Sequence, residues 1–202
     1  MAEYIVKIFD IKQIIHNVKR FRFEKPNGYN FIPGQATDVS VNKGGWKDKL
    51  NPFTFTCLPE DNFLEFTIKI YNERHAVTEQ IGKLEVGDSF IIKDVFGTIN
   101  YKGKGVFIAG GAGITPFLAI LRDLHKKNKL KGNKLIFSNK TEKDIILREE
   151  LKEMLGNDVT FVLTKEKKKG YDYGRIDASY LGKKIKDFNQ NFYICGPLEM
   201  VK

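Results

Sequence analysis

Short apolar or alternating runs recur through the first hundred residues of the chain, and turn-forming residues separate them. The runs lie at 4–9, 18–23, 37–41, 53–56, 63–70 and 89–92. Many short strands at this spacing predict an antiparallel barrel or sandwich. One helix is expected to interrupt them over 75–84, because Val77, Ile81 and Leu84 fall at helical intervals.

The pattern changes after residue 102. A strand at 106–109 runs into a glycine cluster, and the alternation that follows is a helix (115–126), a strand (134–138), a helix (145–155) and two strands (159–163 and 191–195). Strands that alternate with helices predict a parallel sheet with helices on its faces. The expected fold class is therefore β followed by α/β, with one domain over residues 1–101 and a second over residues 102–202.

Composition excludes several classes of function. Hydrophobic residues make up 42% of the chain and charged residues 29%, as in ordinary globular proteins. No run approaches the ~18 apolar residues of a membrane span, and the first residues lack the apolar run of a signal peptide, so we expect a cytoplasmic protein without a membrane partner. Two cysteines, Cys57 and Cys195, are too few for an iron–sulfur cluster, which needs about four thiolates. No metal site is expected.

The chain is basic, with 34 Lys and Arg against 25 Asp and Glu and a net charge of +9. Such a charge attracts acidic partners and speeds their encounter. Nucleic acid is not expected as the partner, because the sequence has no zinc-finger spacing, no RNA-binding aromatic signature and no basic region with heptads. An acidic protein, a phosphate-rich cofactor and simple solubility remain as explanations of the charge.

The strongest local signal is Gly-Gly-Ala-Gly at 110–113, between a buried-looking strand and a helix. Glycines let the backbone turn tightly and let a pyrophosphate approach closely, while the start of the helix supplies unpaired N–H groups. Pro116 suits the first helical turn, where its missing N–H costs nothing. The alternative is a strand–helix turn with a purely structural role.

Two segments of the second half together resemble the nucleotide domain of the ferredoxin–NADP reductase superfamily. They are Gly-Gly-Ala-Gly-Ile-Thr-Pro at 110–116 and Tyr-Ile-Cys-Gly-Pro-Leu-Glu-Met at 193–200. The segments at 138–144 and 173–176 look like further parts of that domain. In the first half, Pro-Gly-Gln at 33–35, Asn-Pro-Phe-Thr at 51–54 and His-Ala-Val-Thr at 75–78 are similar to flavin-domain motifs. The resemblance spans roughly residues 4–202.

The resemblance implies that a flavin-binding barrel and an NAD(P)-binding domain pass a hydride from nicotinamide to flavin. Thr54 would face flavin N5, and Thr115 and Cys195 would converge on the nicotinamide ring. These three are the candidate catalytic residues. The resemblance implies a wider cofactor-binding set: Asn51, Pro52, Phe53, Thr54, Lys69, Ile70, Tyr71, His75, Ala76, Val77, Thr78, Gly110, Gly111, Ala112, Gly113, Ile114, Thr115, Pro116, Asn139, Lys140, Arg175, Cys195, Gly196, Pro197 and Met200.

Asn51 departs from the family pattern, which has Arg at this position to reach the flavin phosphates. Lys69 or Arg74 would then supply the cation, and FMN stays open beside the favoured FAD. Lys140, helped by Lys165 and Arg175, would hold the 2′-phosphate of NADPH, although enzymes that use NADH carry similar residues.

The chain stops before the final strand of the family, so either its tail is shortened or this member leaves the flavin face open. The resemblance implies that reduced flavin passes electrons to a separate acceptor. Flavodoxin and ferredoxin are acidic as a class and match the +9 charge. A free-flavin or ferric reductase is the second hypothesis. A non-catalytic module that binds a nucleotide or docks a partner is the third, supported by Asn51 and the short C-terminus.

Overall fold

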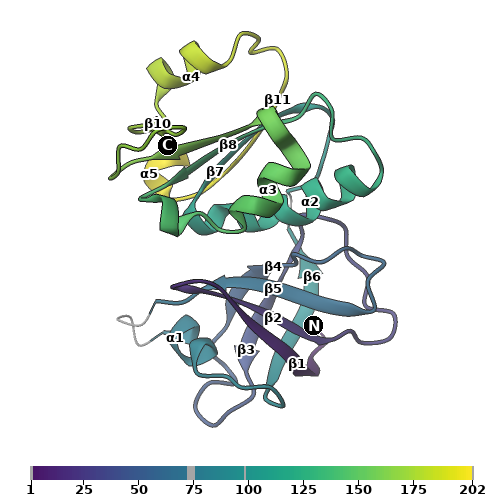
Figure 1. Cartoon of the computed structure of the whole chain (residues 1–202). Helices are drawn as coiled ribbons and strands as arrows, with labels where there is room; N and C mark the ends of the chain where they lie inside the picture. The colour runs from purple at the N-terminus through teal and green to yellow at the C-terminus, as the bar shows by residue number, and fades with distance from the viewer. Residues whose placement is uncertain (1, 72–75, 98, 202) are drawn as a thin grey trace.

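The first domain of the computed structural model is an antiparallel sheet of six strands in the order β4-β3-β6-β1-β2-β5, and the structure describes residues 2–71, 76–97 and 99–201 (Figure 1). A bridge between Phe55 and Phe66 joins the two ends of this order and closes the sheet toward a barrel. The elements are β1 (Tyr4–Ile15), β2 (Val18–Glu24), β3 (Ala36–Val41), β4 (Asn51–Thr54), β5 (Phe63–Lys69), β6 (Ser89–Phe96) and one short helix, α1 (Val77–Gly82).

Aromatic side chains fill the interior of this barrel. Alternation along the strands points one residue in two inward, and the buried positions include Phe21, Phe23, Phe55, Phe66 and Phe90. Their rings pack closely, with centroids 4.7 Å apart for Phe23 and Phe66 and 5.3 Å apart for Phe55 and Phe66. Each such ring buries a large apolar area in edge or offset contacts, so the core of the barrel is largely aromatic.

The second domain is a parallel sheet of five strands in the order β10-β9-β8-β7-β11. Figure 1 shows α2 and α3 between this sheet and the barrel, with α4 on the far side. The predicted fold class is confirmed. The elements are β7 (Gly105–Gly110), α2 (Thr115–Lys126), β8 (Lys134–Asn139), α3 (Arg148–Leu155), β9 (Val159–Leu163), β10 (Asp172–Tyr173), α4 (Ala178–Lys184), β11 (Asn191–Cys195) and α5 (Leu198–Val201), with short 3-10 turns at Gly111–Ile114, Glu142–Asp144 and Gly156–Asp158.

Some predicted boundaries were wrong. The helix expected over 145–155 begins only at Arg148, because Leu147 adopts a left-handed conformation with φ of 52° and Ile145 is extended. The strand expected over 53–56 spans Asn51–Thr54, and the described part of the helix expected over 75–84 spans Val77–Gly82.

Helix α4 and strand β10 were not predicted. Helix α4 does carry a readable start signal, since the carboxylate of Asp177 accepts a hydrogen bond from the Tyr180 N–H. It has no buried residue, however, so no hydrophobic period marks it. Strand β10 has only two residues.

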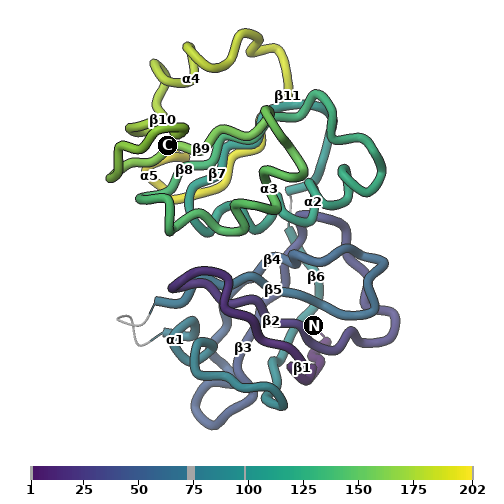
Figure 2. The backbone as a smooth tube through the Cα atoms, viewed as in Figure 1, coloured from purple at the N-terminus to yellow at the C-terminus, as the bar shows by residue number. Residues whose placement is uncertain are grey.

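The two domains share an apolar seam. Val18, in the turn region of the β1–β2 hairpin, is fully buried in the core of the second domain, and Ile14 and Ile15 pack against the same cluster. Figure 2 shows this purple hairpin running toward the underside of the second domain. Ile99 and Tyr101 of the linker also pack there. The barrel is therefore held against the nucleotide domain by two segments of the first domain, the end of the β1–β2 hairpin and the linker that follows β6.

Candidate functional site

The glycine-rich turn is packed from behind and open in front. A Cβ on Gly113 would lie 2.2 Å from the carbonyl oxygen of Cys195, and one on Gly110 would lie 2.8 Å from Pro197. Gly111 differs, because its φ of +53° favours glycine and no atom of the described residues lies within 4 Å of its Cβ position. The turn thus presents bare backbone at Gly111, where a phosphate group could approach.

Strand pairing places the second loop of the predicted site beside this turn. Strand β11 pairs in parallel with β7, with Cys195 opposite Ala109, so both loops leave the same edge of the sheet. The S-methyl group of Met200 lies close to the Cβ positions of both Gly110 and Gly196. Ligands bind at the carboxyl ends of strands in open parallel sheets. The structure therefore brings the two predicted nucleotide loops together.

Thr115 and Cys195 belong to these two loops. The Thr115 hydroxyl donates to the Ala112 carbonyl oxygen at 3.0 Å and holds the turn at the start of α2, while Pro116 is buried in its first helical turn. Cys195 is partly exposed, and burial raises the pKa of its thiol. The thiol therefore stays neutral at pH 7. This suits a side chain that lines a site and not one that attacks a substrate.

Asn139 ends β8 in an unusual state. It is 5% exposed, yet both atoms of its side-chain amide are buried without a hydrogen-bond partner within the described residues. Buried polar groups in native structures are nearly always paired, so this amide fits a site that a ligand or water completes. The open backbone at Gly111, at the end of the neighbouring strand β7, leaves room for a phosphate and fits a bound dinucleotide.

Two exposed lysines follow the ends of β8 and β9. The Lys165 N–H donates to the Lys140 carbonyl oxygen at 2.9 Å, so the two residues are neighbours beyond the sheet edge. Arg175 is also exposed and lies two residues after β10, the strand next to β9. The three predicted partners of a 2′-phosphate thus follow three adjacent strands.

The flavin motif occupies β4, which pairs with β3. Asn51 is opposite Val39 and Thr54 is opposite Ala36, while Pro52 is exposed. Phe53 is only partly buried, and its ring lies 5.9 Å from that of Phe66. This partly exposed aromatic beside Thr54 offers an apolar edge for a flat ring.

The second flavin segment crosses from β5 to α1. Lys69 is half-buried beside Asp144 and Lys140 of the nucleotide domain; burial lowers its pKa, the Lys140 charge adds to this and Asp144 opposes it. Ile70 and Tyr71 follow, and Ile70 packs on Gly82 of α1. Lys69 therefore lies at the seam between the domains. The predicted residues His75 and Arg74 lie outside the described residues.

Among the described residues, no side chain caps the start of helix α1 at Ala76. Val77 and Thr78 are buried in its first turn. The N–H groups at the start of a helix need an acceptor, and a phosphate satisfies them. The uncapped start therefore fits the predicted flavin pyrophosphate.

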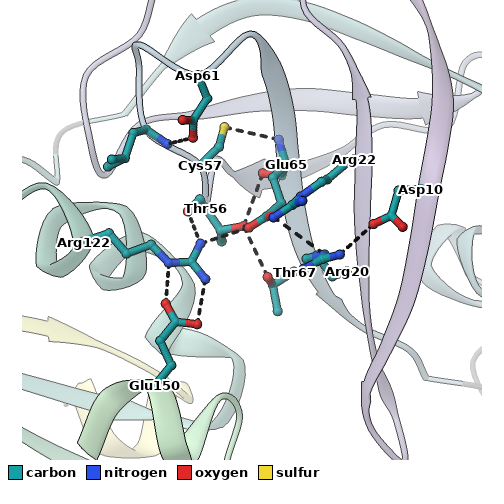
Figure 3. Close-up of polar contacts among 11 residues, drawn as sticks. Asp10, Arg20, Arg22, Thr56, Cys57, Asp61, Glu65, Thr67, Arg122 and Glu150 are labelled. Carbon is teal, nitrogen blue, oxygen red and sulfur yellow. Dashed lines mark hydrogen bonds and ion pairs between the residues drawn. The ribbon is translucent and has the colours of Figure 1, made fainter. Parts of the chain in front are cut away.

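Two contacts across the seam join the two half-sites, which are the predicted flavin-binding residues of the barrel and the predicted nucleotide loops of the second domain. A Cβ on Gly34 would lie 2.3 Å from the Ile99 carbonyl oxygen and 3.1 Å from Ile120 of α2, so the Pro-Gly-Gln turn packs closely on linker and helix. Arg122 of α2 donates to the carbonyl oxygen of Thr56, two residues beyond Thr54 (Figure 3). The contact between Arg122 and Thr56 therefore lies close to both predicted catalytic threonines. Thr54 is about 7 Å from it along an extended chain, and Thr115 is about 10 Å from it along helix α2.

Sequence reasoning missed Arg122 and Glu65. Glu65 is 2% exposed on β5 and binds Arg122 across the seam. A charged residue inside the apolar run of β5 was the only signal for it. Within the described residues no cluster of metal-binding side chains occurs. No helix in the described part is long and apolar enough to cross a membrane.

Comparison with known families agrees with this geometry. Residues 6–101 match the oxidoreductase FAD-binding domain, and residues 107–202 match the oxidoreductase NAD-binding domain. Human NADH-cytochrome b5 reductase 1 is 30% identical, across 75% of this chain and 60% of that protein. The counterpart from Dictyostelium discoideum is 33% identical, across 72% of this chain and 54% of that protein. The chain thus spans little more than half the length of these curated relatives.

Solved structures share the fold. A ferredoxin NADP+ reductase from Neisseria gonorrhoeae with bound FAD and NADP superposes with a TM-score of 0.85 at 20% identity, covering 100% of this chain and 88% of that one. The CS-b5R domains of human Ncb5or give a TM-score of 0.84 at 24% identity, covering 98% and 63%.

Proposed function

The chain belongs to the ferredoxin–NADP reductase superfamily, with an FAD-binding and an NAD-binding domain, and on this premise we propose that it is an NAD(P)H-dependent flavoprotein reductase that serves a separate electron acceptor. The observation that carries the proposal is the junction between the half-sites. Helix α2 begins at the nucleotide turn and contacts the chain just beyond the flavin motif. Two ring systems held by these motifs would meet at the domain seam.

The residues divide the binding work between them. Gly111 and the start of α2 would receive the pyrophosphate of the dinucleotide, and the unpaired amide of Asn139 would bind a neighbouring polar group. Thr115 and Cys195 would orient the nicotinamide, and Thr54 would hydrogen-bond near flavin N5. Bound FAD would supply the redox chemistry, accepting a hydride and releasing its electrons one or two at a time. None of these side chains has to move a proton.

The acceptor is proposed to be an acidic electron-carrier protein. The +9 charge supports such a partner, because opposite charge speeds encounter and orients docking. Flavodoxin and ferredoxin are the first candidates. Cytochrome b5 is the second, since several relatives are named NADH-cytochrome b5 reductase.

Anaerobic titration of the purified, FAD-loaded protein tests the reductase itself. Adding NADPH or NADH should bleach the visible absorbance of the oxidised flavin. A protein that takes up no FAD, or whose bound FAD neither coenzyme reduces, would contradict the proposal and favour a non-catalytic module.

Stopped-flow oxidation of the reduced protein identifies the acceptor. Flavodoxin, ferredoxin, cytochrome b5, free FMN and a ferric chelate should be compared at low and high salt. Fast transfer to one acidic protein that slows steeply with salt is expected. Faster turnover with free FMN or the ferric chelate, indifferent to salt, would instead identify a free-flavin or ferric reductase.

A further inference from the structure

Arg122 makes contacts with three separate parts of the molecule (Figure 3). Its Nη1 atom donates to Glu65 Oε1 of the barrel at 2.9 Å and to the Thr56 carbonyl oxygen. Its Nε and Nη2 atoms bind both carboxylate oxygens of Glu150 on α3, the latter at 3.0 Å. The planar guanidinium therefore holds helix α3 of its own domain with one edge and the barrel with the other.

Residues of the barrel hold the carboxylate that binds this guanidinium. Glu65 is almost completely buried on β5, and its Oε2 atom accepts from Arg22 Nε at 2.9 Å. The Thr56 hydroxyl donates to its Oε1 atom at 2.9 Å. Because two partners within the barrel already hold the carboxylate in place, it presents a fixed acceptor to Arg122.

The charges in the cluster balance. Three cations, Arg20, Arg22 and Arg122, alternate with three anions, Asp10, Glu65 and Glu150. Burial of Glu65 favours its neutral form, but the Arg122 charge and the hydrogen bonds from Arg22, Arg122 and Thr56 outweigh burial and lower its pKa. The carboxylate is therefore charged at pH 7.

Other polar contacts across the seam are far more exposed. Lys126 pairs with Glu60 at 2.6 Å, but the two side chains are 56% and 46% exposed. His16 lies 3.4 Å from Asp144 and is 47% exposed. Exposed ion pairs do little to fix the position of one domain on the other, because water and salt screen their attraction. The Arg122 side chain is only 21% exposed and is fixed at both edges.

We propose that Arg122 is the positioning residue of the reductase: through Glu65 and Thr56 it fixes the register of the nucleotide domain on the barrel and thereby the spacing between nicotinamide and flavin. This inference rests on the proposed function. Arg122 lies two helical turns after Thr115 and contacts the chain two residues after Thr54. A shift of helix α2 along the barrel would therefore change the distance between the two half-sites.

Loss of Arg122 should therefore slow hydride transfer and leave the binding of each cofactor unchanged. Neither half-site contains Arg122, so each cofactor should still bind. Hydride transfer, however, depends steeply on the distance between the reacting atoms, and a misplacement of about 1 Å costs on the order of 100-fold in rate.

The test compares the wild type with Arg122→Met and Arg122→Lys, each loaded with FAD. In stopped-flow reduction by NADPH or NADH, Arg122→Met should lower the limiting rate roughly ten- to hundred-fold and leave the coenzyme Kd within about twofold. It should also weaken the long-wavelength charge-transfer absorbance that stacked nicotinamide and flavin produce. Arg122→Lys keeps a charge beside Glu65 but lacks the planar fork that spans Glu65, Thr56 and Glu150, so it should fold and give a limiting rate between those of the wild type and Arg122→Met.

A second readout needs no cofactor. Calorimetry of the FAD-free protein should show one cooperative unfolding transition for the wild type and two separated transitions for Arg122→Met, because the two domains no longer unfold together. Lys126→Met is the matched control, since it removes an exposed ion pair across the same seam from the same helix. It should behave as the wild type in both measurements.

The outcomes separate the two proposals. If neither coenzyme reduces the wild-type flavin, the proposed function fails, while calorimetry still reports on domain register. If the wild type is reduced and both Arg122 variants keep its limiting rate, its charge-transfer absorbance and a single transition, the positioning role is overturned. An equal loss in Lys126→Met would also overturn it, because any contact at the seam would then serve.

Discussion

Arg122 on α2 and Glu65 on β5 come from different domains, and their side chains meet with Arg122 Nη1 2.9 Å from Glu65 Oε1. Neither residue belongs to a cofactor motif. Their pairing nevertheless determines how the two motif-bearing halves face one another, because each residue is also held firmly within its own domain. The first two predictions concern this pair.

Removing the charge of Glu65 should destabilise the protein strongly. Glu65→Gln leaves three arginines around a buried neutral amide, and breaking a buried ion pair from one side costs about 3–5 kcal/mol. The free energy of unfolding, measured by urea denaturation, should fall by that order. Glu60→Gln removes the anion of an exposed pair across the same seam and should cost less than about 1 kcal/mol. Equal losses in the two variants would contradict the special role of the buried pair.

The same carboxylate makes stability depend on pH. The pKa of Glu65 is lowered in the folded protein, so its stabilising contribution is present above the unfolded pKa of about 4.3 and is lost as pH falls through the folded pKa. Urea unfolding should therefore be compared for the wild type and Glu65→Gln between pH 7 and pH 3. The difference in their free energies of unfolding should become smaller at the acidic end. A difference that grows on acidification would contradict a lowered pKa of Glu65.

The glycines of the nucleotide turn should fail in different ways. Gly113→Ala drives a methyl group into the Cys195 backbone and should lower the melting temperature, at a cost of about 1–3 kcal/mol. The methyl group of Gly111→Ala meets no neighbour in the described part of the chain, and its left-handed φ costs about 1–2 kcal/mol. Its methyl group would stand where a phosphate approaches, so calorimetric titration should show weaker binding of NADP+ or NAD+.

Gly156→Ala is the matched control for Gly111→Ala. Gly156 has nearly the same φ, +55°, and equally open space, but it follows α3 away from the turn. Its ψ of −118° lies outside the left-handed helical region, so the variant should lose at least as much stability as Gly111→Ala, and it should keep the full affinity for the nucleotide. Loss of affinity in both variants would assign the effect to backbone strain alone.

The two thiols should differ in reactivity. Burial raises the pKa of Cys57 to about 12, and that residue is 3% exposed, so iodoacetamide should barely modify it at pH 8. Cys195 also has a raised pKa but is partly exposed, so it should react first, and bound NADP+ should slow its reaction. Mass spectrometry of the peptides measures both sites. Faster labelling of Cys57, or no protection of Cys195 by nucleotide, would argue against the proposed location of the nicotinamide.

Lys140 should determine coenzyme preference. If it holds the 2′-phosphate, Lys140→Gln removes one charge-assisted contact and should raise the Kd for NADP+ by roughly tenfold or more, with little change for NAD+. The neighbouring exposed Lys143→Gln is the control and should change neither value. Equal effects of Lys140→Gln on both nucleotides would mean that it does not recognise the 2′-phosphate.

Local pattern determined much of this protein. The alternation of short strands, the strand–helix alternation after residue 102 and the glycine turn at 110–113 predict the two folds and the nucleotide loop, because periodicity and turn chemistry act over a few residues. The start of α3 escaped prediction because Leu147 adopts a left-handed conformation that its side-chain type does not favour.

Only the tertiary structure decided how the halves meet. Glu65 is 57 residues from Arg122 along the chain, and nothing local marks them as partners. Their pairing exists because the folded barrel buries a carboxylate on β5 and helix α2 brings Arg122 against it. The close approach of Gly113 to the Cys195 backbone is likewise a consequence of the pairing between β7 and β11. A long-range contact depends on the whole fold, whereas an element depends mainly on its own residues.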